Sequence, residues 1–215
     1  MPTAPTRQTI GSRLRASWPR LRRWLLRGTL VALLAPLLIS LSFNFYQPPT
    51  TAVMLRRGVQ RALDGKQPWY PHRDVVSRRA IAPSLRRAVL AAEDDRFYLH
   101  WGLDVVEIQK AIDRAERGGR LRGASTITQQ VAKNIFLWEG RSFLRKGLEA
   151  YLTLVLELTL PKERILDLYL NLAEWGDGVF GAEMAARRHF GVSAARLTPE
   201  QSARLAAILP SPRRW

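Results

Sequence analysis

Uncharged polar side chains are concentrated in the segment from Gly123 to Gln130. Five of its eight residues carry a hydroxyl or an amide, namely Ser125, Thr126, Thr128, Gln129 and Gln130. Such groups supply donors and acceptors over a short distance, as a sugar or an amide ligand requires. Lys133 follows within one helical turn, so the same segment can reach an anion. The pattern favours a site that binds sugar and anion together.

A simpler interpretation of this segment is the start of a helix. Thr126 and Gln129 have the spacing of a capping box. Apolar residues at helical spacing would form the buried stripe behind it: Ile127, Val131 and Ile135. Capping needs only one Thr and one Gln, so Ser125, Thr128 and Gln130 stay unexplained. Thr126 and Gln129 can both start the helix and line the site, and the sequence does not apportion them.

Three acidic residues, Glu93-Asp94-Asp95, end an apolar helical run over 88–92. Acids at the C-terminus of a helix oppose its dipole and repel each other, a cost that hints at function. A carboxylate against apolar walls has a raised pKa and can act as a general base or acid near neutral pH. The alternative is that Arg96 or a distant arginine simply pairs with the cluster.

A second carboxylate, Glu149, follows several cations closely. Arg141, Arg145 and Glu149 are spaced four residues apart, and Lys146 lies between the last two. Ser142 is expected to cap a helix, and Arg145 and Glu149 would lie on the same face of it. The alternative to a site is an ordinary surface ion pair, worth at most about 1 kcal/mol.

Composition excludes several classes of site. The 215 residues contain no cysteine, so disulfides and thiolate metal sites are excluded, and the three histidines match no zinc spacing. The net charge is +16, and no acidic residue precedes Asp64. This excess suggests an anionic partner, which can be nucleic acid, a phosphate-bearing substrate or lipid headgroups.

One segment predicts a membrane anchor. Residues 28–46 carry no charge and approach the roughly 20 residues that span a bilayer. Arginines precede the segment, which places the N-terminus in the cytoplasm by the positive-inside rule. A cleaved signal peptide is the rival, but Thr50-Thr51-Ala52 is a poor cleavage site. The rest of the chain is then outside the cytoplasmic membrane, which counts against nucleic acid as a partner.

Helical periodicity dominates from Pro83 onward, so the expected class is mainly α. Residues 52–82 show only weak periodicity. Asp104 is expected to cap a helix, Pro161 to open one, and Thr198 to begin one through a capping box with Gln201. The expected apolar stripes are Leu85, Val89 and Ala92; Val105, Ile108, Ile112 and Ala115; Leu144, Leu148, Leu152 and Val155; Ile165, Leu168, Tyr169 and Leu172. The G-x-G-x-x-G match at 176–181 follows an expected helix, so we interpret it as a turn and not as a dinucleotide site.

Several segments together resemble the five motifs of the peptidoglycan glycosyltransferases. The first four patterns are E-D-x-x-F-x-x-H-x-G from Glu93, G-x-S-T-x-x-Q-Q from Gly123, R-K-x-x-E from Arg145 and K-x-x-I-L-x-x-Y-L-N from Lys162. The fifth covers Gly178–Gly181, Ala185 and 189–191. The resemblance runs in the family's order from about residue 81 to 215. Ala124 stands where Ser or Gly is common and His189 where Tyr is usual.

The resemblance implies a lysozyme-like, mainly α glycosyltransferase domain preceded by one transmembrane helix. The expected organisation is a basic cytoplasmic tail (1–27), a transmembrane signal-anchor (28–46), a linker and membrane-proximal segment (47–82) and the glycosyltransferase domain (83–215). It also implies an enzyme of the inner membrane, with a periplasmic catalytic domain. The enzyme would polymerise lipid II into β-1,4-linked glycan by inverting single displacement. Besides lipid II and the growing glycan, its partners would be membrane lipids and proteins of cell-wall synthesis or division.

The same resemblance implies roles for individual residues. Glu93 would deprotonate the attacking 4-hydroxyl, and Glu149 would orient cations or hold a divalent ion such as Mg or Mn; no cofactor is otherwise required. Substrate binding would fall to Ser125, Thr126, Gln129, Gln130, Lys133, Arg141, Arg145 and Lys146. Site-shaping residues would be Asp94, Phe97, His100 and Asn134. The rivals are a lysozyme-like enzyme that cleaves glycan and a non-catalytic membrane scaffold of the synthesis machinery.

Overall fold

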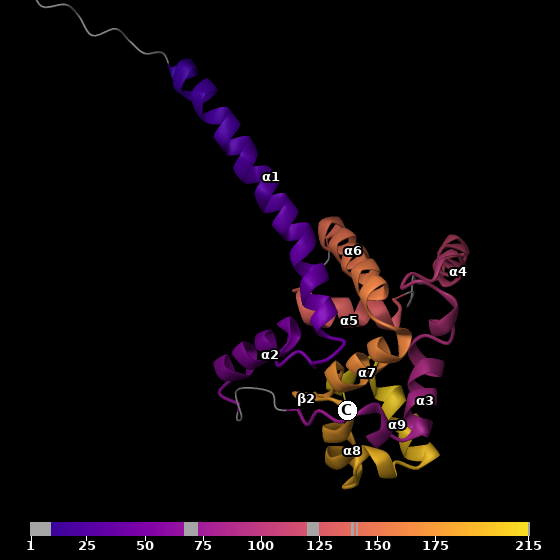
Figure 1. Ribbon diagram of the computed structural model, residues 1–215. Coiled ribbons are helices and arrows are strands. Elements are labelled where there is room, and N and C mark those ends of the chain that lie inside the picture. The colour runs from indigo at the N-terminus through magenta and orange to yellow at the C-terminus, as the bar shows by residue number, and fades with distance from the viewer. Residues whose placement is uncertain (1–9, 67–72, 120–124, 139, 141, 215) are drawn as a thin grey trace, which may run out of the picture. The chain divides into compact units, whose positions relative to one another are not determined.

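The computed structural model describes residues 10–66, 73–119, 125–138, 140 and 142–214, with side chains described from residue 21 onward. The chain divides into two compact units, residues 1–39 and 40–215. Most described residues are helical, so the mainly α class is confirmed (Figure 1).

The N-terminal unit consists of most of helix α1, Ile10–Ser42. Its stretch Leu21–Ser42 is long and apolar enough to cross a membrane. At about 1.5 Å per residue, 22 residues extend about 33 Å, which matches the roughly 30 Å hydrocarbon core of a bilayer. The chain therefore contains one candidate transmembrane helix near its N-terminus. The helix is continuous through Gly28, where the sequence predicted the tail to end.

The segment that the sequence suggested to be a linker contains helix α2, Ala52–Leu63, capped by Thr51. Val53 and Met54 on this helix form a small core with Phe180. The buried face of α2 also includes Arg57 and a glycine. Arg57 and this glycine interrupt the apolar residues of the buried face, so apolar spacing did not predict this helix.

The core of the second unit surrounds helix α7, Lys162–Leu172, which is buried at every position from Ile165 onward. Helix α3, Pro83–Glu93, packs against α9, Pro199–Ile208, and helix α5, Ile127–Phe136, packs against α7 (Figure 1). The predicted starts at Asp104, Ser142 and Thr198 are confirmed by side-chain caps. Pro161 is the residue before the first turn of α7 and not its first helical residue.

Helices α4, Val105–Glu116, and α6, Phe143–Thr159, depart from the predicted burial. The expected stripe of α4 is largely uncovered, since Val105 is 70% exposed and the buried residue is Ala111. On α6, Leu152 and Val155 are buried but Leu144 is 73% exposed. On α3, Ala92 is exposed as well. Periodicity locates an apolar face but does not show whether another element covers it.

A short hairpin follows α7. Strand β1, Glu174–Gly176, pairs antiparallel with β2, Val179–Phe180, through the G-x-G-x-x-G match. Gly181 has φ of 82°, and a Cβ there would lie 3.1 Å from the carbonyl oxygen of Asn171. The glycines therefore form a turn and a close backbone approach, as predicted. Helix α8, Ala182–Phe190, comes next; 3-10 turns cover Arg78–Ala80, Phe97–Leu99, Ala194–Arg196 and Pro212–Arg214.

Candidate active site

Glu93 is the last residue of α3, and its carboxylate accepts a hydrogen bond from Nε2 of Gln130 at 2.7 Å. Burial raises the pKa of Glu93, and the nearby charge of Asp94 raises it further. The Gln130 hydrogen bond and the positive charge of Lys133 act in the opposite direction without cancelling the effect. Only one oxygen of Glu93 is hydrogen-bonded among the described residues, and a carboxylate with a raised pKa is suited to take a proton near neutral pH.

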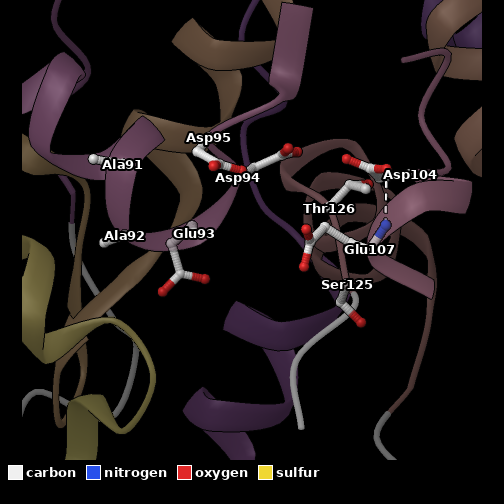
Figure 2. A pocket seen from close by; sticks show the side chains of 9 residues that line it. All are labelled: Ala91, Ala92, Glu93, Asp94, Asp95, Asp104, Glu107, Ser125 and Thr126. Carbon is white, nitrogen blue, oxygen red and sulfur yellow. Dashed lines mark hydrogen bonds between the residues drawn. The ribbon is translucent and has the colours of Figure 1, made fainter. Parts of the chain in front are cut away.

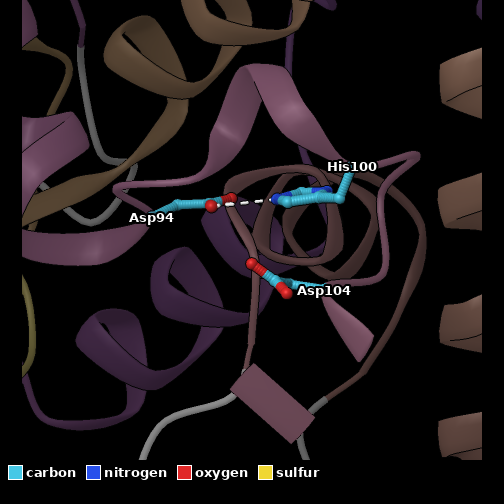
Figure 3. Close-up of side chains that lie close together, drawn as sticks. All are labelled: Asp94, His100 and Asp104. Atoms are coloured by element: carbon cyan, nitrogen blue, oxygen red, sulfur yellow. Dashed lines mark hydrogen bonds and ion pairs between the residues drawn. The ribbon is translucent and has the colours of Figure 1, made fainter. Parts of the chain in front are cut away.

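Asp94 has a different environment from Glu93, although the two are adjacent. Its Oδ2 accepts the backbone N–H of Ile127 at 2.9 Å, and its Oδ1 lies 2.9 Å from Nε2 of His100 (Figure 3). The N-terminus of α5 thus compensates a charge that the C-terminus of α3 disfavours. Arg96 pairs with Asp104 at 3.0 Å and not with the acidic cluster, so the suggestion that Arg96 pairs with that cluster is wrong.

Further residues of the first motif stabilise the loop that follows Asp94. Phe97 is buried, its ring lies edge-on to the ring of His100, and Lys162 lies 4.4 Å from its centroid. Gly102 has φ of 72°, and a Cβ there would lie 2.5 Å from Thr153. The carbonyl of Gly102 accepts a hydrogen bond from the hydroxyl of Thr126 at 2.5 Å. The first and second motifs are therefore connected by three hydrogen bonds, at Glu93, Asp94 and Gly102.

The capping box of Thr126 and Gln129 is present as predicted. The backbone N–H of Thr126 donates to Oε1 of Gln129 at 3.0 Å, and both side chains are buried. The hydroxyl of Thr128 donates to Glu157 at 2.6 Å, so this residue has a structural partner. Of the polar groups that capping left unexplained, Ser125 and Gln130 remain as ligand candidates. Gln129 contributes its side-chain oxygen to the helix start, and Gly123 and Ala124 lie outside the described residues.

A cavity of about 160 Å³ opens beside Glu93 (Figure 2). Figure 2 shows the Glu93 carboxylate directed away from those of Asp94 and Asp95. The lining residues are Ala91, Ala92, Glu93, Asp94, Asp95, Asp104, Glu107, Ser125 and Thr126. We name it the acidic cavity. Because carboxylates accept hydrogen bonds, it suits hydroxyl and amide donors and disfavours phosphate.

A second cavity, of about 280 Å³, is lined by cations. Its polar lining residues are Arg57, Gln130, Lys133, Asn134, Tyr169, Glu174 and Arg213. We name it the basic cavity. Arg57 is paired with Glu174 at 2.9 Å, whereas Lys133 has no ion-pair partner within the described part of the chain. Gln130 lines this cavity and bonds Glu93, so it lies between the carboxylate and the cations.

Sequence reasoning missed four polar residues of the basic cavity, one of which is Glu174 on β1. Tyr169 was expected only as a core residue, although it lies in the fourth motif. Arg213 belongs to the closing segment, which carried no helical signal, and Arg57 lies on the helix that weak periodicity concealed.

Glu149 is 3% exposed, so it is not a surface ion pair. One oxygen accepts from Arg145 at 2.9 Å and the other from Lys146 at 2.5 Å. Arg145 and Lys146 line a further cavity with Ser142 and Phe143, separate from the two beside Glu93. Arg141 lies outside the described residues.

Neither carboxylate cluster is well suited to a divalent ion. Both oxygens of Glu149 already contact cations. Asp94, His100 and Asp104 have potential ligand atoms within 4.8 Å of one another (Figure 3). Asp104 is, however, occupied by Arg96 and by the N–H groups of Val106 and Glu107. These contacts make the second cluster a structural network.

A helical domain that holds a carboxylate with a raised pKa in a cavity suits an enzyme that transfers glycosyl groups or cleaves glycans. Comparison with known families decides between these classes. The family model described as "Transglycosylase" matches residues 62–215, and the chain belongs to this family.

Curated relatives agree with the family match. A protein named "Biosynthetic peptidoglycan transglycosylase" from Pseudomonas putida (strain GB-1) is 52% identical over 92% of this chain and 83% of its own length. Proteins with the same name from Xanthomonas campestris pv. campestris (strain B100) and Pseudomonas entomophila (strain L48) are 51% and 54% identical. They cover 90% and 82% of this chain, and the matches span 78% and 75% of their own lengths.

Proposed function

We propose that this enzyme polymerises lipid II into β-1,4-linked glycan strands for the bacterial cell wall, with release of undecaprenyl pyrophosphate. The growing glycan is the donor and lipid II is the acceptor. The observation that carries the proposal is the position of Glu93, whose carboxylate has a raised pKa and a hydrogen bond to Gln130, between an acidic and a basic cavity. Family membership and the names of the relatives supply the substrate class.

The chemistry assigned to Glu93 is removal of the proton from the attacking 4-hydroxyl of the acceptor sugar. The hydroxyl oxygen then forms the new bond to the anomeric carbon as the bond to pyrophosphate breaks. One displacement inverts the anomeric centre, which converts the α-linked donor into a β-linkage. Hydroxyl and amide groups of the sugars match the acceptors of the acidic cavity and the exposed Ser125.

The leaving group is a pyrophosphate, which needs cations more than a strong acid. Lys133 has no competing ion-pair partner in the described part of the chain and lines the basic cavity with Asn134. We assign Lys133 to stabilise charge that develops on the phosphate oxygens. Glu149 orients Arg145 and Lys146 for the same purpose on the side of α6. No step requires a divalent ion.

A lipid substrate requires access from the membrane, and α6 supports such access. Phe143 is 99% exposed and Leu144 is exposed beside it, next to Arg145 and Lys146. Apolar side chains flanked by cations are suited to the boundary between lipid chains and anionic headgroups. The basic residues before the anchor support an orientation with the N-terminus in the cytoplasm and the catalytic domain in the periplasm. We propose proteins of cell-wall synthesis or division as further partners, and no nucleic acid.

One experiment separates the proposal from its rivals. The purified full-length protein is supplied with lipid II and, separately, with preformed uncrosslinked glycan, and product lengths are resolved on gels. Polymer of increasing length supports the proposal. Shortening of preformed glycan would instead support the lysozyme-like enzyme, and no reaction with either substrate would favour the scaffold.

A further inference from the structure

Tyr169 connects the core of the domain to Glu93 through one intervening side chain. Its ring is buried, and its hydroxyl donates to Oε1 of Gln130 at 3.3 Å. Nε2 of Gln130 in turn donates to Glu93 at 2.7 Å. The sequence predicted Tyr169 only as a core residue, and the mechanism above assigns it no role. A packed core side chain would not need a hydroxyl at this position.

The two ends of the Gln130 amide are not equivalent toward an ionised carboxylate. The nitrogen end donates, the oxygen end accepts, and ionised Glu93 only accepts. If the amide turned around, its oxygen would face the carboxylate and two acceptors would oppose each other. A donor on the far side of the amide favours the productive orientation, and the hydroxyl of Tyr169 is in place to supply it.

We propose that Tyr169 is a positioning residue whose buried hydroxyl orients the Gln130 amide so that its N–H faces the carboxylate of Glu93. The inference rests on the proposed role of Glu93 as the base. Burial and the nearby charges of Glu93 and Asp94 raise the pKa of Tyr169 well above its usual value, so the hydroxyl keeps its proton. Once Glu93 has taken a proton, the amide can turn around, so that its oxygen accepts from the carboxylic acid and its N–H donates to the Tyr169 hydroxyl.

Other charged residues also influence the pKa of Glu93 or lie near Tyr169, so a test must leave them unchanged. Lys133 and Asp94 act directly on Glu93. Arg57, Glu174 and Arg213 line the basic cavity, which Tyr169 also lines. None of these groups needs to be changed to remove the hydroxyl of Tyr169, so its replacement by phenylalanine isolates the orienting bond.

The test measures initial rates of lipid II polymerisation against pH for full-length wild type, Tyr169→Phe and Tyr98→Phe. Without the orienting bond, the Gln130 hydrogen bond to ionised Glu93 weakens and the pKa of Glu93 rises. We expect the acidic limb of the rate–pH profile of Tyr169→Phe to lie about half a pH unit higher than that of wild type. A shift of this size corresponds to the loss of one weak hydrogen bond. KM should stay unchanged. Tyr98 is half exposed, so its replacement is the matched control and should leave the limb in place.

A double-mutant cycle shows whether Tyr169 acts through Gln130. In a Gln130→Ala background, Tyr169→Phe should move the limb no further. An unmoved limb in the single variant, or the same shift in both backgrounds, would overturn the inference. If Tyr169→Phe does not fold, 3-fluorotyrosine at position 169 strengthens the donor and should move the limb to lower pH, and an unmoved limb there overturns the inference equally. Absence of polymer from the wild type would instead refute the proposed function.

Discussion

Replacement of Glu93 by glutamine removes the proposed base and keeps the shape of the side chain. The amide oxygen of the variant can still accept from Gln130, so the contact between α3 and α5 is preserved. The adjacent carboxylate of Asp94 is not free to substitute, because both of its oxygens are already bonded. We therefore expect the full loss of about 10²–10⁴ in rate that removal of a general base causes. This corresponds to about 3–5 kcal/mol in the activation barrier.

The assay is the initial rate of lipid II polymerisation by full-length protein, with Glu200→Gln as the matched control. Glu200 is exposed on α9 and pairs only with Arg204 among the described contacts, so its variant should retain nearly full activity. Normal polymerisation by Glu93→Gln would refute the assignment of the base.

Stability distinguishes loss of the base from loss of the fold. Folding raises the pKa of Glu93, so the protonated form is favoured in the folded state. The resulting contribution to the free energy of unfolding is fully present below the ordinary pKa of glutamate. It is lost as pH rises through the pKa of Glu93 in the folded state. At neutral pH the wild type therefore carries a buried charge that Glu93→Gln lacks. The Tm of the variant should be no lower than that of wild type at pH 7.5, and any advantage should shrink below pH 4.5.

Three further predictions concern other parts of the structure. Lys133→Ala should lower kcat about 10²-fold with Tm nearly unchanged, because Lys133 has no ion-pair partner in the described chain; a large fall in Tm would make the lysine structural. Glu149→Gln should cost about 3 kcal/mol in urea unfolding, because Arg145 stays largely buried without its counter-charge, and an unchanged midpoint would contradict the burial. In nanodiscs of brominated lipid, full-length Phe143→Trp should show quenching beyond the wild-type level, whereas Arg204→Trp should not; equal quenching of both would remove α6 from the membrane boundary.

Local rules predicted the starts of the helices well. Thr126, Ser142 and Thr198 cap their helices because capping depends on residues within one turn. The central helix α7 was equally predictable from its apolar spacing. Helix α2 was not, because its buried face includes Arg57, whose charge is neutralised by Glu174 at a distance of 117 residues along the chain. A partner so remote leaves no local pattern.

The sequence predicted which types of residue form the candidate site, but not which of their side chains bond each other. The excess of polar groups after Gly123 pointed to a site, but it could not show that Thr128 would bond Glu157 while Gln130 would bond Glu93. Likewise, the charge pattern around Glu149 did not distinguish an exposed pair from a buried one. Which polar side chains bond each other, and which charges become buried, is decided when segments from different helices pack together. Local sequence patterns do not show which segments will meet.

The central claim is that Glu93 takes the proton in the reaction, and its own titration tests this most directly. The carboxyl 13C resonance of Glu93, assigned by its absence in Glu93→Gln, is followed against pH in the full-length protein and compared with the rate profile on lipid II. We predict that the pKa of Glu93 lies above the ordinary value for a glutamate and coincides with the acidic limb of the rate profile. Titration at or below the ordinary value, or a limb that does not follow it, would contradict the account.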